Sequence, residues 1–234
     1  MRFVGDLDPK VSWVVDQVLR PGDTALDIGS NLGLVSLRMA ARVGPTGAVH
    51  AFDPQPRMQA YLRKTMDLNP NLPITLHPIG LGPSSDTLQL TIPAHNAGAA
   101  SLVASVGTTH PSAQTVDVSV EPLDSYAKAA GITNVRMIKM DVEGFEAQVL
   151  KGASAFLEEN KPVVILLEDN ARDAASGQSQ ALKILQELGY AIYTLPRALF
   201  SVRLGKVSDG DAAHDFVAVS PQAPTQLRRK LRIS

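Results

Sequence analysis

Residues 135–153, with the sequence VRMIKMDVEGFEAQVLKGA, constrain the fold of this chain more than any other segment. A short apolar run ends at position 140 and is followed at once by three carboxylates, a glycine and a segment with the apolar spacing of a helix. This order predicts a buried strand that leads directly into a helix. In an open α/β sheet, ligands bind outside the carboxyl ends of the strands, so Asp141, Glu143 and Glu146 lie where a reaction centre is expected.

Strand and helix patterns alternate along most of the chain. The first helix is predicted to begin at Asp8, an N-cap residue that precedes a proline. The repeated strand–helix–strand order predicts a mostly parallel sheet with right-handed crossovers, and the last two strands predict an antiparallel edge. Strands are predicted at 24–28, 48–52, 74–81, 135–140, 162–168, 190–195 and 214–219, and helices at 31–43, 56–68, 122–130, 145–157 and 178–188.

Residues 82–120 break this alternation and predict a β insert after the third strand. Apolar and polar residues alternate on both sides of a connection at 93–114, as in a hairpin or a pair of strands. Connections of this length in compact domains are usually functional or disordered, and we expect this one to close over the cleft when a ligand binds. His95 and His110 lie in it and are candidate general bases, although a histidine in a surface loop usually has no catalytic role.

The overall composition is that of an ordinary folded domain. The chain has 234 residues, a net charge of −1, a mean hydropathy of +0.02 and no cysteine, which excludes disulfides and thiolate nucleophiles. We expect a single domain over residues 1–234 and no nucleic-acid partner. No apolar run reaches the length of a membrane span or a signal sequence, so we expect no membrane partner and a cytoplasmic location. The oligomeric state is left open, a homodimer included, and the basic end at 227–233 is expected to be solvated.

A second strand end carries the motif DIGSNLG at 27–33. A dinucleotide-binding loop needs glycine at its first, third and sixth positions. These are Gly29, Asn31 and Leu34 here, so two of the three requirements fail and a nicotinamide dehydrogenase is disfavoured. An acid followed by glycine or a polar residue at alternate positions resembles instead the loop of S-adenosylmethionine-dependent methyltransferases.

The parts of this motif suit a nucleotide-like cofactor. Gly29 allows a sharp turn and a close approach of the ligand, and the helix expected from Asn31 offers free N–H groups to a carboxylate. Asp53, at the end of the second strand, is placed to accept both hydroxyls of a ribose. The same features also occur in tight strand-to-helix junctions and helix caps. Together they predict a cofactor site made of Asp27, Gly29, Ser30, Asn31, Gly33 and Asp53.

Three blocks, at 27–34, 120–126 and 138–153, closely resemble the FkbM-like family of S-adenosylmethionine-dependent methyltransferases. The resemblance implies an α/β fold with a Rossmann-like seven-strand class I methyltransferase sheet, and S-adenosylmethionine as methyl donor. It also implies O-methylation of a hydroxyl on a sugar, polyketide or other secondary metabolite, and thus a small-molecule or glycoside acceptor. Some relatives methylate nitrogen on peptide side chains. The insert and the carboxyl end lie outside the resemblance, and we expect them to select the acceptor.

The reaction centre is predicted at the acids after the fourth strand of the main pattern. Methyl transfer mainly needs an aligned acceptor and a group that removes its proton. Asp141 and Glu143 are candidates for that role, or else they only cap the helix, whereas Glu146 is expected to be structural. Lys139, in an otherwise apolar strand, is expected to pair with a carboxylate.

The sequence also suggests a metal. Asp141, Asp169 and Asn170 reproduce the types of residue that hold Mg²⁺ in some O-methyltransferases, such as the catechol class, and hard oxygen ligands are what this ion needs. Helix capping explains the same residues without a metal. Glu168, at the end of the next strand, is a further candidate to hydrogen-bond the acceptor.

Two hypotheses of different class follow. The first is a small-molecule O-methyltransferase, with N-methylation of a peptide side chain as its variant. The second is a cofactor-binding module without catalysis. The glycine turn and the acids near Asp141 favour the enzyme.

Overall fold

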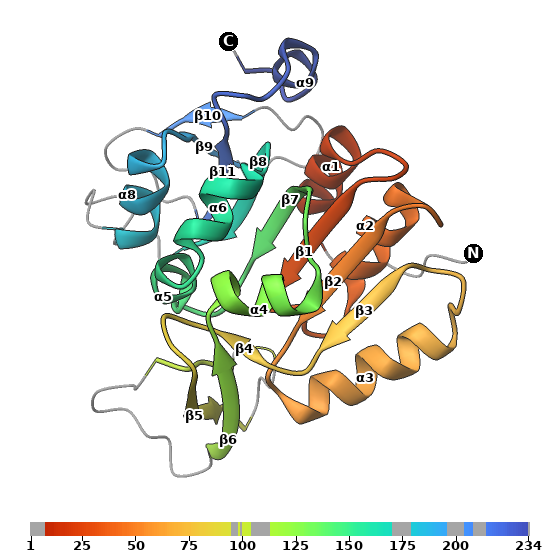
Figure 1. The fold of residues 1–234 in the computed structure, drawn as a ribbon, viewed down its shortest axis with the longest axis vertical. Coiled ribbons are helices and arrows are strands. Elements are labelled where there is room, and N and C mark those ends of the chain that lie inside the picture. Colours follow the sequence, from red (N-terminus) through yellow and green to blue (C-terminus); the bar gives the residue numbers. More distant parts are fainter. Residues whose placement is uncertain are drawn as a thin grey trace.

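The computed structural model describes residues 8–94, 98, 100–103, 113–169, 179–195, 204–207 and 214–233. Its centre is an eight-stranded sheet in the order β10-β9-β11-β8-β7-β1-β2-β3, with helices on both faces (Figure 1). The strands are β1 (Thr24–Ile28), β2 (Ala48–Phe52), β3 (Ile74–His77), β7 (Val135–Met140), β8 (Val164–Glu168), β9 (Ala191–Thr194), β10 (Gly205–Lys206) and β11 (Asp215–Val219).

The pairing confirms the predicted class I methyltransferase sheet. β3, β2, β1, β7 and β8 are parallel neighbours, whereas β11 is antiparallel to both β8 and β9. Each of the seven predicted strands has a counterpart in this sheet, the one at 74–81 only in its first half, and β10 adds a two-residue eighth at the edge. β9 and β11 therefore form the expected antiparallel edge. β11, the last strand in the sequence, lies between β9 and β8.

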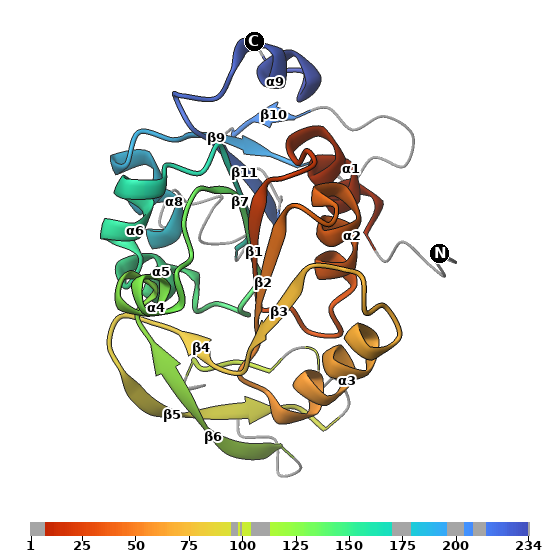
Figure 2. The same cartoon turned by 45° about the vertical axis from the view of Figure 1, so that its right-hand side comes forward.

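The helices form two layers, seen from the side in Figure 2. One layer packs α1, α2 and α3 against the sheet with α9 beyond them, and the other packs α4, α5, α6 and α8 on the opposite face. Each layer buries its own apolar cluster, so the sheet is covered on both sides, as a parallel sheet requires. The helices are α1 (Pro9–Val18), α2 (Leu34–Val43), α3 (Pro56–Asp67), α4 (Leu123–Ala130), α5 (Glu146–Lys151), α6 (Ser154–Asn160), α8 (Gln180–Glu187) and α9 (Thr225–Lys230).

The predicted insert forms a separate three-stranded sheet beyond the end of β3 (Figure 1). β5 (Asp86–Ile92) and β6 (Gln114–Glu121) pair in antiparallel fashion, and β4 (Gly80–Leu81) runs parallel to β6. The expected continuous strand at 74–81 was wrong, because it divides into β3 and β4 around Pro78, which has no N–H for a ladder. Much of the connection at 93–114, with His95 and His110, lies outside the described residues.

Two predicted helices were too long. α2 begins three residues later than expected because Asn31 and Gly33 have left-handed φ angles of 50° and 78°. The helix expected at 145–157 is interrupted at Gly152, where a Cβ atom would lie 1.9 Å from the carbonyl oxygen of Gly82. The start of the insert therefore crosses α5 at its end, and only a glycine leaves room for it.

The basic end of the chain is not simply solvated, contrary to the expectation. Leu227 of α9 and Leu231, directly after the helix, are fully buried in the same cluster as residues of α1 and α2. Arg228 donates to the carbonyl oxygens of Ser220 at 2.8 Å and Ala223 at 3.3 Å. No helix in the described part of the chain is long and apolar enough to cross a membrane.

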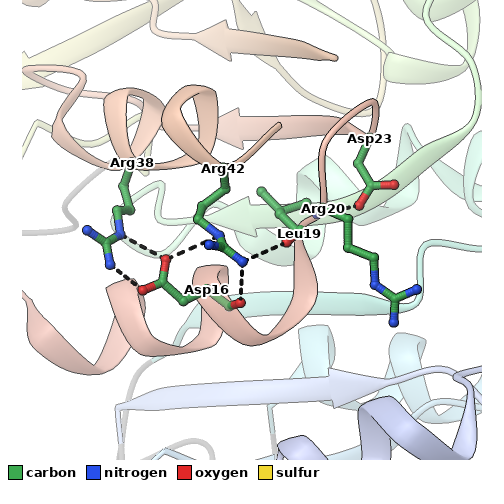
Figure 3. Close-up of polar contacts among 6 residues, drawn as sticks. All are labelled: Asp16, Leu19, Arg20, Asp23, Arg38 and Arg42. Carbon is green, nitrogen blue, oxygen red and sulfur yellow. Dashed lines mark hydrogen bonds and ion pairs between the residues drawn. The ribbon is translucent and has the colours of Figure 1, made fainter. Parts of the chain in front are cut away.

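Polar contacts hold α1 on α2 (Figure 3). The Asp16 side chain of α1 accepts from Arg38 Nε at 3.0 Å, and its carbonyl oxygen accepts from Arg42 Nη2 at 3.0 Å. At the other end of α1, Asp8 caps the helix as predicted by accepting from the N–H of Lys10 at 2.8 Å. This fixes the amino end of α1 beside the carboxyl ends of the central strands, where it forms one wall of a cavity.

Candidate active site

Two cavities open at the carboxyl ends of the central strands, and they share Asn31 and Asp141. The first has a volume of about 630 Å³ with its open mouth included, and the second about 990 Å³. The first lies between the ends of β1 and β2, the start of α3 and the insert, with walls that include Phe52, Asp53, Gln55, Met58, Ile79 and Leu81. The second lies between α1, the start of α2 and the ends of β7 and β8, with walls that include Asp8, Ser12, Ser30, Lys139, Glu168 and Asp215.

The glycine turn after β1 is held by the neighbouring strands. The N–H groups of Gly29 and Ser30 both donate to the carbonyl oxygen of Phe52 at 3.0 Å. Gly29 has a φ of 74°, and a Cβ atom there would lie 1.8 Å from the carbonyl oxygen of Asp141. The direction of a side chain at Gly29 is filled by the backbone after β7, while the Gly29 backbone itself lines the first cavity, so close approach of a ligand to it stays a prediction. Gly33 also has a positive φ, of 78°, but a Cβ there would meet only the end of the Leu62 side chain, at 2.3 Å.

Asp53 lies in the first cavity and is oriented by two backbone groups. One carboxylate oxygen accepts from the N–H of Asn31 at 2.7 Å and the other from the N–H of Gln55 at 2.9 Å. Burial raises the pKa of Asp53 to about 6, although these two hydrogen bonds oppose the shift. Each oxygen keeps a second lone pair, so the carboxylate can still accept the two hydroxyls of a ribose.

Lys139 connects the glycine turn to the acids, and it pairs with carboxylates as predicted. Its Nζ donates to the carbonyl oxygen of Gly29 at 2.9 Å and lies 3.5 Å from Asp27 and 3.4 Å from Asp141. Burial alone would lower the pKa of Lys139, but the two carboxylates outweigh burial and raise it. The ammonium group is therefore charged and shared between two acids.

Asp27, predicted to bind cofactor, lies beneath the turn and lines neither cavity. It is fully buried, and it accepts from the Ser36 hydroxyl at 2.5 Å. Burial raises the pKa of Asp27, and Lys139 and Ser36 act against that rise. Its position suits support of the turn and of Lys139 more than contact with a ligand.

The three acids around the β7–α5 turn have different surroundings. Asp141 lines both cavities, and Glu143 is exposed at the rim of the first. Partial desolvation and then the Asp141 charge raise the pKa of Glu143. Glu146 is only 3% exposed, and it folds back to accept from the N–H groups of Val142 at 3.1 Å and Gly144 at 3.2 Å. These bonds agree with the structural role expected for Glu146.

Glu168 is exposed at the end of β8 and lines the second cavity. It stands directly opposite Asp215 in the β8–β11 register. Desolvation of the carboxyl, followed by the charges of Asp141 and Asp215, raises the pKa of Glu168 to about 7. The side chain is therefore able to hold or give up a proton near neutral pH.

The residues predicted to bind Mg²⁺ are not brought together in the described structure. Asp141 lines the two main cavities, whereas Asp169 lines a third with Glu146 and accepts a short hydrogen bond from the Ser179 hydroxyl. Asn170 lies outside the described residues. Within the described ranges no group of three or more histidine or acidic residues could hold a metal ion. The described residues therefore do not support an Mg²⁺ site.

The histidines fall into two groups. His95 and His110 lie outside the described residues, so their role as general base stays a prediction. His50 and His77 pack as expected, and they also form a hydrogen-bonded chain that the sequence did not indicate. His50 Nδ1 lies 3.0 Å from His77 Nε2, and His77 Nδ1 lies 3.0 Å from the Tyr126 hydroxyl.

Sequence reasoning missed most of the second cavity. Asp8 and Asp215 line it from opposite ends of the chain, and no local motif marks either one as part of a site. The apolar wall of the first cavity was also missed, although the position of Met58 in the helix after Asp53 was a usable signal.

Comparison with known proteins agrees with this architecture. The Methyltransferase FkbM domain matches residues 27–195. A protein of Beauveria bassiana named Methyltransferase 1 is 29% identical over 191 residues, which is 74% of each chain. The crystal structure of a methyltransferase FkbM from Methylobacillus flagellatus is 18% identical with a TM-score of 0.51, and it covers 87% of this chain and 48% of that one. A SAM-dependent O-methyltransferase from Thermotoga maritima is 14% identical with a TM-score of 0.50, over 94% and 68% of the two chains.

The sheet order and the structural matches show the fold of class I S-adenosylmethionine-dependent methyltransferases. Because the FkbM domain covers more than half of the sequence, the chain belongs to the FkbM methyltransferase family. The donor is thereby established as S-adenosylmethionine, and the acceptor is left to be inferred from the site.

Proposed function

We propose that the protein transfers a methyl group from S-adenosylmethionine to a hydroxyl of a small-molecule or glycoside acceptor, such as a sugar, a polyketide or another secondary metabolite. The observation that carries this proposal is the pair of cavities that meet at Asn31 and Asp141. A methyltransferase has to bring its methyl donor and its acceptor into contact at one point. Two cavities with a common wall provide such a point.

The first cavity suits the adenosine part of the donor. Its volume lies within the range of about 300–1,000 Å³ that is usual for ligand pockets. Asp53 presents two oriented oxygens for the ribose hydroxyls, while Phe52, Met58 and Ile79 give an apolar wall for a planar base. Asp53 and these apolar residues thus match the two chemical halves of a nucleoside.

The second cavity suits a polar acceptor. It opens on the other side of Asn31 and Asp141 and carries hydroxyl, carboxylate and apolar groups on its walls. S-adenosylmethionine supplies an electrophilic methyl group, so this chain has to align the acceptor and take up its proton. Carboxylates are suited to both tasks, because they accept hydrogen bonds from hydroxyl groups.

An amine acceptor is the alternative that one observation favours. The second cavity carries more carboxylates than cations on its described walls, and such walls also attract a protonated amine. N-methylation of a peptide side chain is therefore the second candidate function.

The test is transfer from methyl-labelled S-adenosylmethionine to a panel of sugar, glycoside, polyketide and peptide acceptors, with S-adenosylhomocysteine binding measured by calorimetry. Methylation of a hydroxyl acceptor supports the proposal, and methylation of peptides alone supports the alternative. Binding of S-adenosylhomocysteine without transfer to any acceptor would indicate a module that binds cofactor only.

A further inference from the structure

We propose that Glu168 takes the proton from the hydroxyl of an uncharged acceptor bound in the second cavity. This inference rests on the proposed O-methylation and assigns the proton acceptor within it. Glu168 thus replaces the general bases predicted from the sequence, which were Asp141, Glu143, His95 and His110.

The expected position of the bound donor brings its methyl group towards the cavity that Glu168 lines. With its ribose at Asp53, the donor reaches the second cavity across Asn31 and Asp141, which line both cavities. The methyl group is then delivered at this common wall. Glu168 lines the second cavity, and its carboxyl is close enough to Asp141 to respond to that charge. An acceptor oxygen at the common wall is therefore within the part of the cavity that Glu168 bounds.

The partners of the cavity's other carboxylates leave Glu168 as the available group. Asp8 caps α1, Asp141 pairs with Lys139, and Asp215 pairs with Lys10 at 2.5 Å. Among the described residues, Glu168 is the one carboxylate on these walls with neither a hydrogen bond nor an ion pair. A cation or N–H donor beside a carboxylate stabilises its ionised form and makes it a weaker base, and Glu168 has no such bonded partner among the described residues.

The sheet holds Glu168 in a position that is unfavourable for stability alone. Glu168 and Asp215 face each other across β8 and β11, and like charges directly opposite on paired strands are destabilising. Lys10 neutralises Asp215 but leaves Glu168 unpaired. A carboxylate at position 168 lowers stability in this way, which agrees with a role for Glu168 in binding or chemistry.

A second group in the same cavity also lacks a partner. Ser30 lines the cavity and is only 4% exposed, and its hydroxyl has no hydrogen bond to any part of the chain that the structure describes. A buried hydroxyl without a partner is unfavourable, so a polar ligand group is expected to satisfy it. Ser30 therefore points to a hydrogen-bonding ligand independently of the acids.

The charges on the walls restrict the class of acceptor. Four carboxylates line the cavity in the described residues, and Lys139 is the one cation among the residues that line it there. An acceptor with a carboxylate or phosphate near its reacting hydroxyl would be repelled. During transfer, the acceptor oxygen forms its bond to the methyl carbon as the carbon–sulfur bond breaks, and the hydroxyl proton passes to a Glu168 oxygen.

The test uses the first acceptor that the labelled-donor panel identifies. Glu168→Gln keeps the size of the side chain and removes its basicity, so kcat should fall by about 100-fold or more, the usual contribution of a general base. The affinity for S-adenosylhomocysteine should stay within about twofold, since Glu168 does not line the first cavity. Acceptor affinity, measured by calorimetry on the S-adenosylhomocysteine complex, should change much less than kcat.

Two comparisons separate proton transfer from a structural role. An acceptor analogue with fluorine beside the reacting hydroxyl loses its proton more easily, so the Glu168→Gln variant should lose less activity on it than on the parent acceptor. Glu168→Asp should recover part of kcat. Glu158→Gln, the same change at an exposed position on α6 outside both cavities, should have no effect. A carboxylated analogue should be methylated at least about tenfold more slowly by the unchanged protein.

Opposite results are equally clear. A Glu168→Gln variant with kcat within about threefold of the parent protein would overturn the assignment while leaving O-methylation intact, and so would equal losses on both acceptors. Failure to methylate any acceptor, with S-adenosylhomocysteine still bound, would instead overturn the proposed function and this inference with it.

Discussion

Asp53 in the first cavity and Glu168 in the second differ in how their carboxylates are bonded. Around the first, Asp53 accepts two backbone hydrogen bonds, and the Gly29 carbonyl beside it accepts from Lys139. In the second, Glu168 and the Ser30 hydroxyl have no partner among the described residues. Asp53 is thus held in one orientation for a ligand, whereas Glu168 and Ser30 keep polar atoms available for one. If this contrast is correct, mutations around the first cavity should mainly reduce stability or cofactor affinity.

The largest effect is expected at Gly29. A Gly29→Ala variant places a Cβ atom 1.8 Å from the Asp141 carbonyl, so the β1 and β7 turns can no longer pack together. The free energy of unfolding should fall by more than about 4 kcal/mol, or the protein should fail to fold. Gly44→Ala is the matched control, because Gly44 also has a positive φ of 64° but meets nothing within 4 Å. It should cost only about 1 kcal/mol in urea unfolding, and equal losses would show that steric contact at Gly29 is unimportant.

The next largest effect is expected from Lys139→Met. This change leaves Asp27 buried without its cation, and removal of one partner of a buried pair usually costs about 3–5 kcal/mol. Urea unfolding measures the loss. In the double variant with Asp27→Asn, much of the stability should return. Independent, additive losses in that double-mutant cycle would contradict the role of Lys139 as the shared counter-ion.

A smaller effect is expected on cofactor affinity at Asp53. Asp53→Asn removes a charged hydrogen-bond acceptor for the ribose, and binding of S-adenosylhomocysteine should weaken by about 1.5–3 kcal/mol. Because the pKa of Asp53 is raised to about 6, affinity in the unchanged protein should also fall as the pH drops below 6. Calorimetry at pH 8 and pH 5 tests both points. An unchanged affinity in a folded Asp53→Asn variant would remove Asp53 from the cofactor site.

His77, which stacks on Phe52 of the first cavity, should make stability depend on pH. Burial, and then His50, lower the pKa of His77 from 6.5 to about 4, and Phe52 stacks on its ring at 4.5 Å. Between these two values the unfolded chain binds a proton that the folded chain does not. Stability from this group is therefore complete above pH 6.5 and is lost as the pH falls towards 4, by about 1.4 kcal/mol per unit. Urea unfolding of His77→Gln across this window should show a shallower dependence, and an identical slope would exclude His77 as its source.

The smallest effect is expected in the second cavity. Glu168→Gln relieves the repulsion from Asp215, so the protein should become more stable by about 0.5 kcal/mol. Thermal unfolding should show a small rise in Tm. A clear loss of stability would mean that Glu168 supports the fold, and the contrast between the two cavities would then be wrong.

Much of the sheet could be predicted because its signals are local. The strand ending at Met140 and the glycine turn after Ile28 depend on apolar runs and backbone conformations that neighbouring residues specify. Errors arose where a distant segment decided the outcome. The helix after Phe145 breaks at Gly152 because the insert passes over it, and the end of the chain is buried because α1 offers an apolar surface to Leu227.

The sequence by itself determined the α/β class, the methyltransferase family and the positions of Asp53 and Asp141 at neighbouring strand ends. These properties follow from periodicity and from motifs a few residues long. Only the tertiary structure decided that Asp27 supports the turn from below, that Asp169 is directed to another cavity, and that Glu168 is left unpaired. Such outcomes depend on which distant side chains supply a counter-charge. Lys10 reaches Asp215 across 205 positions of the chain, and no pattern along the sequence records that contact.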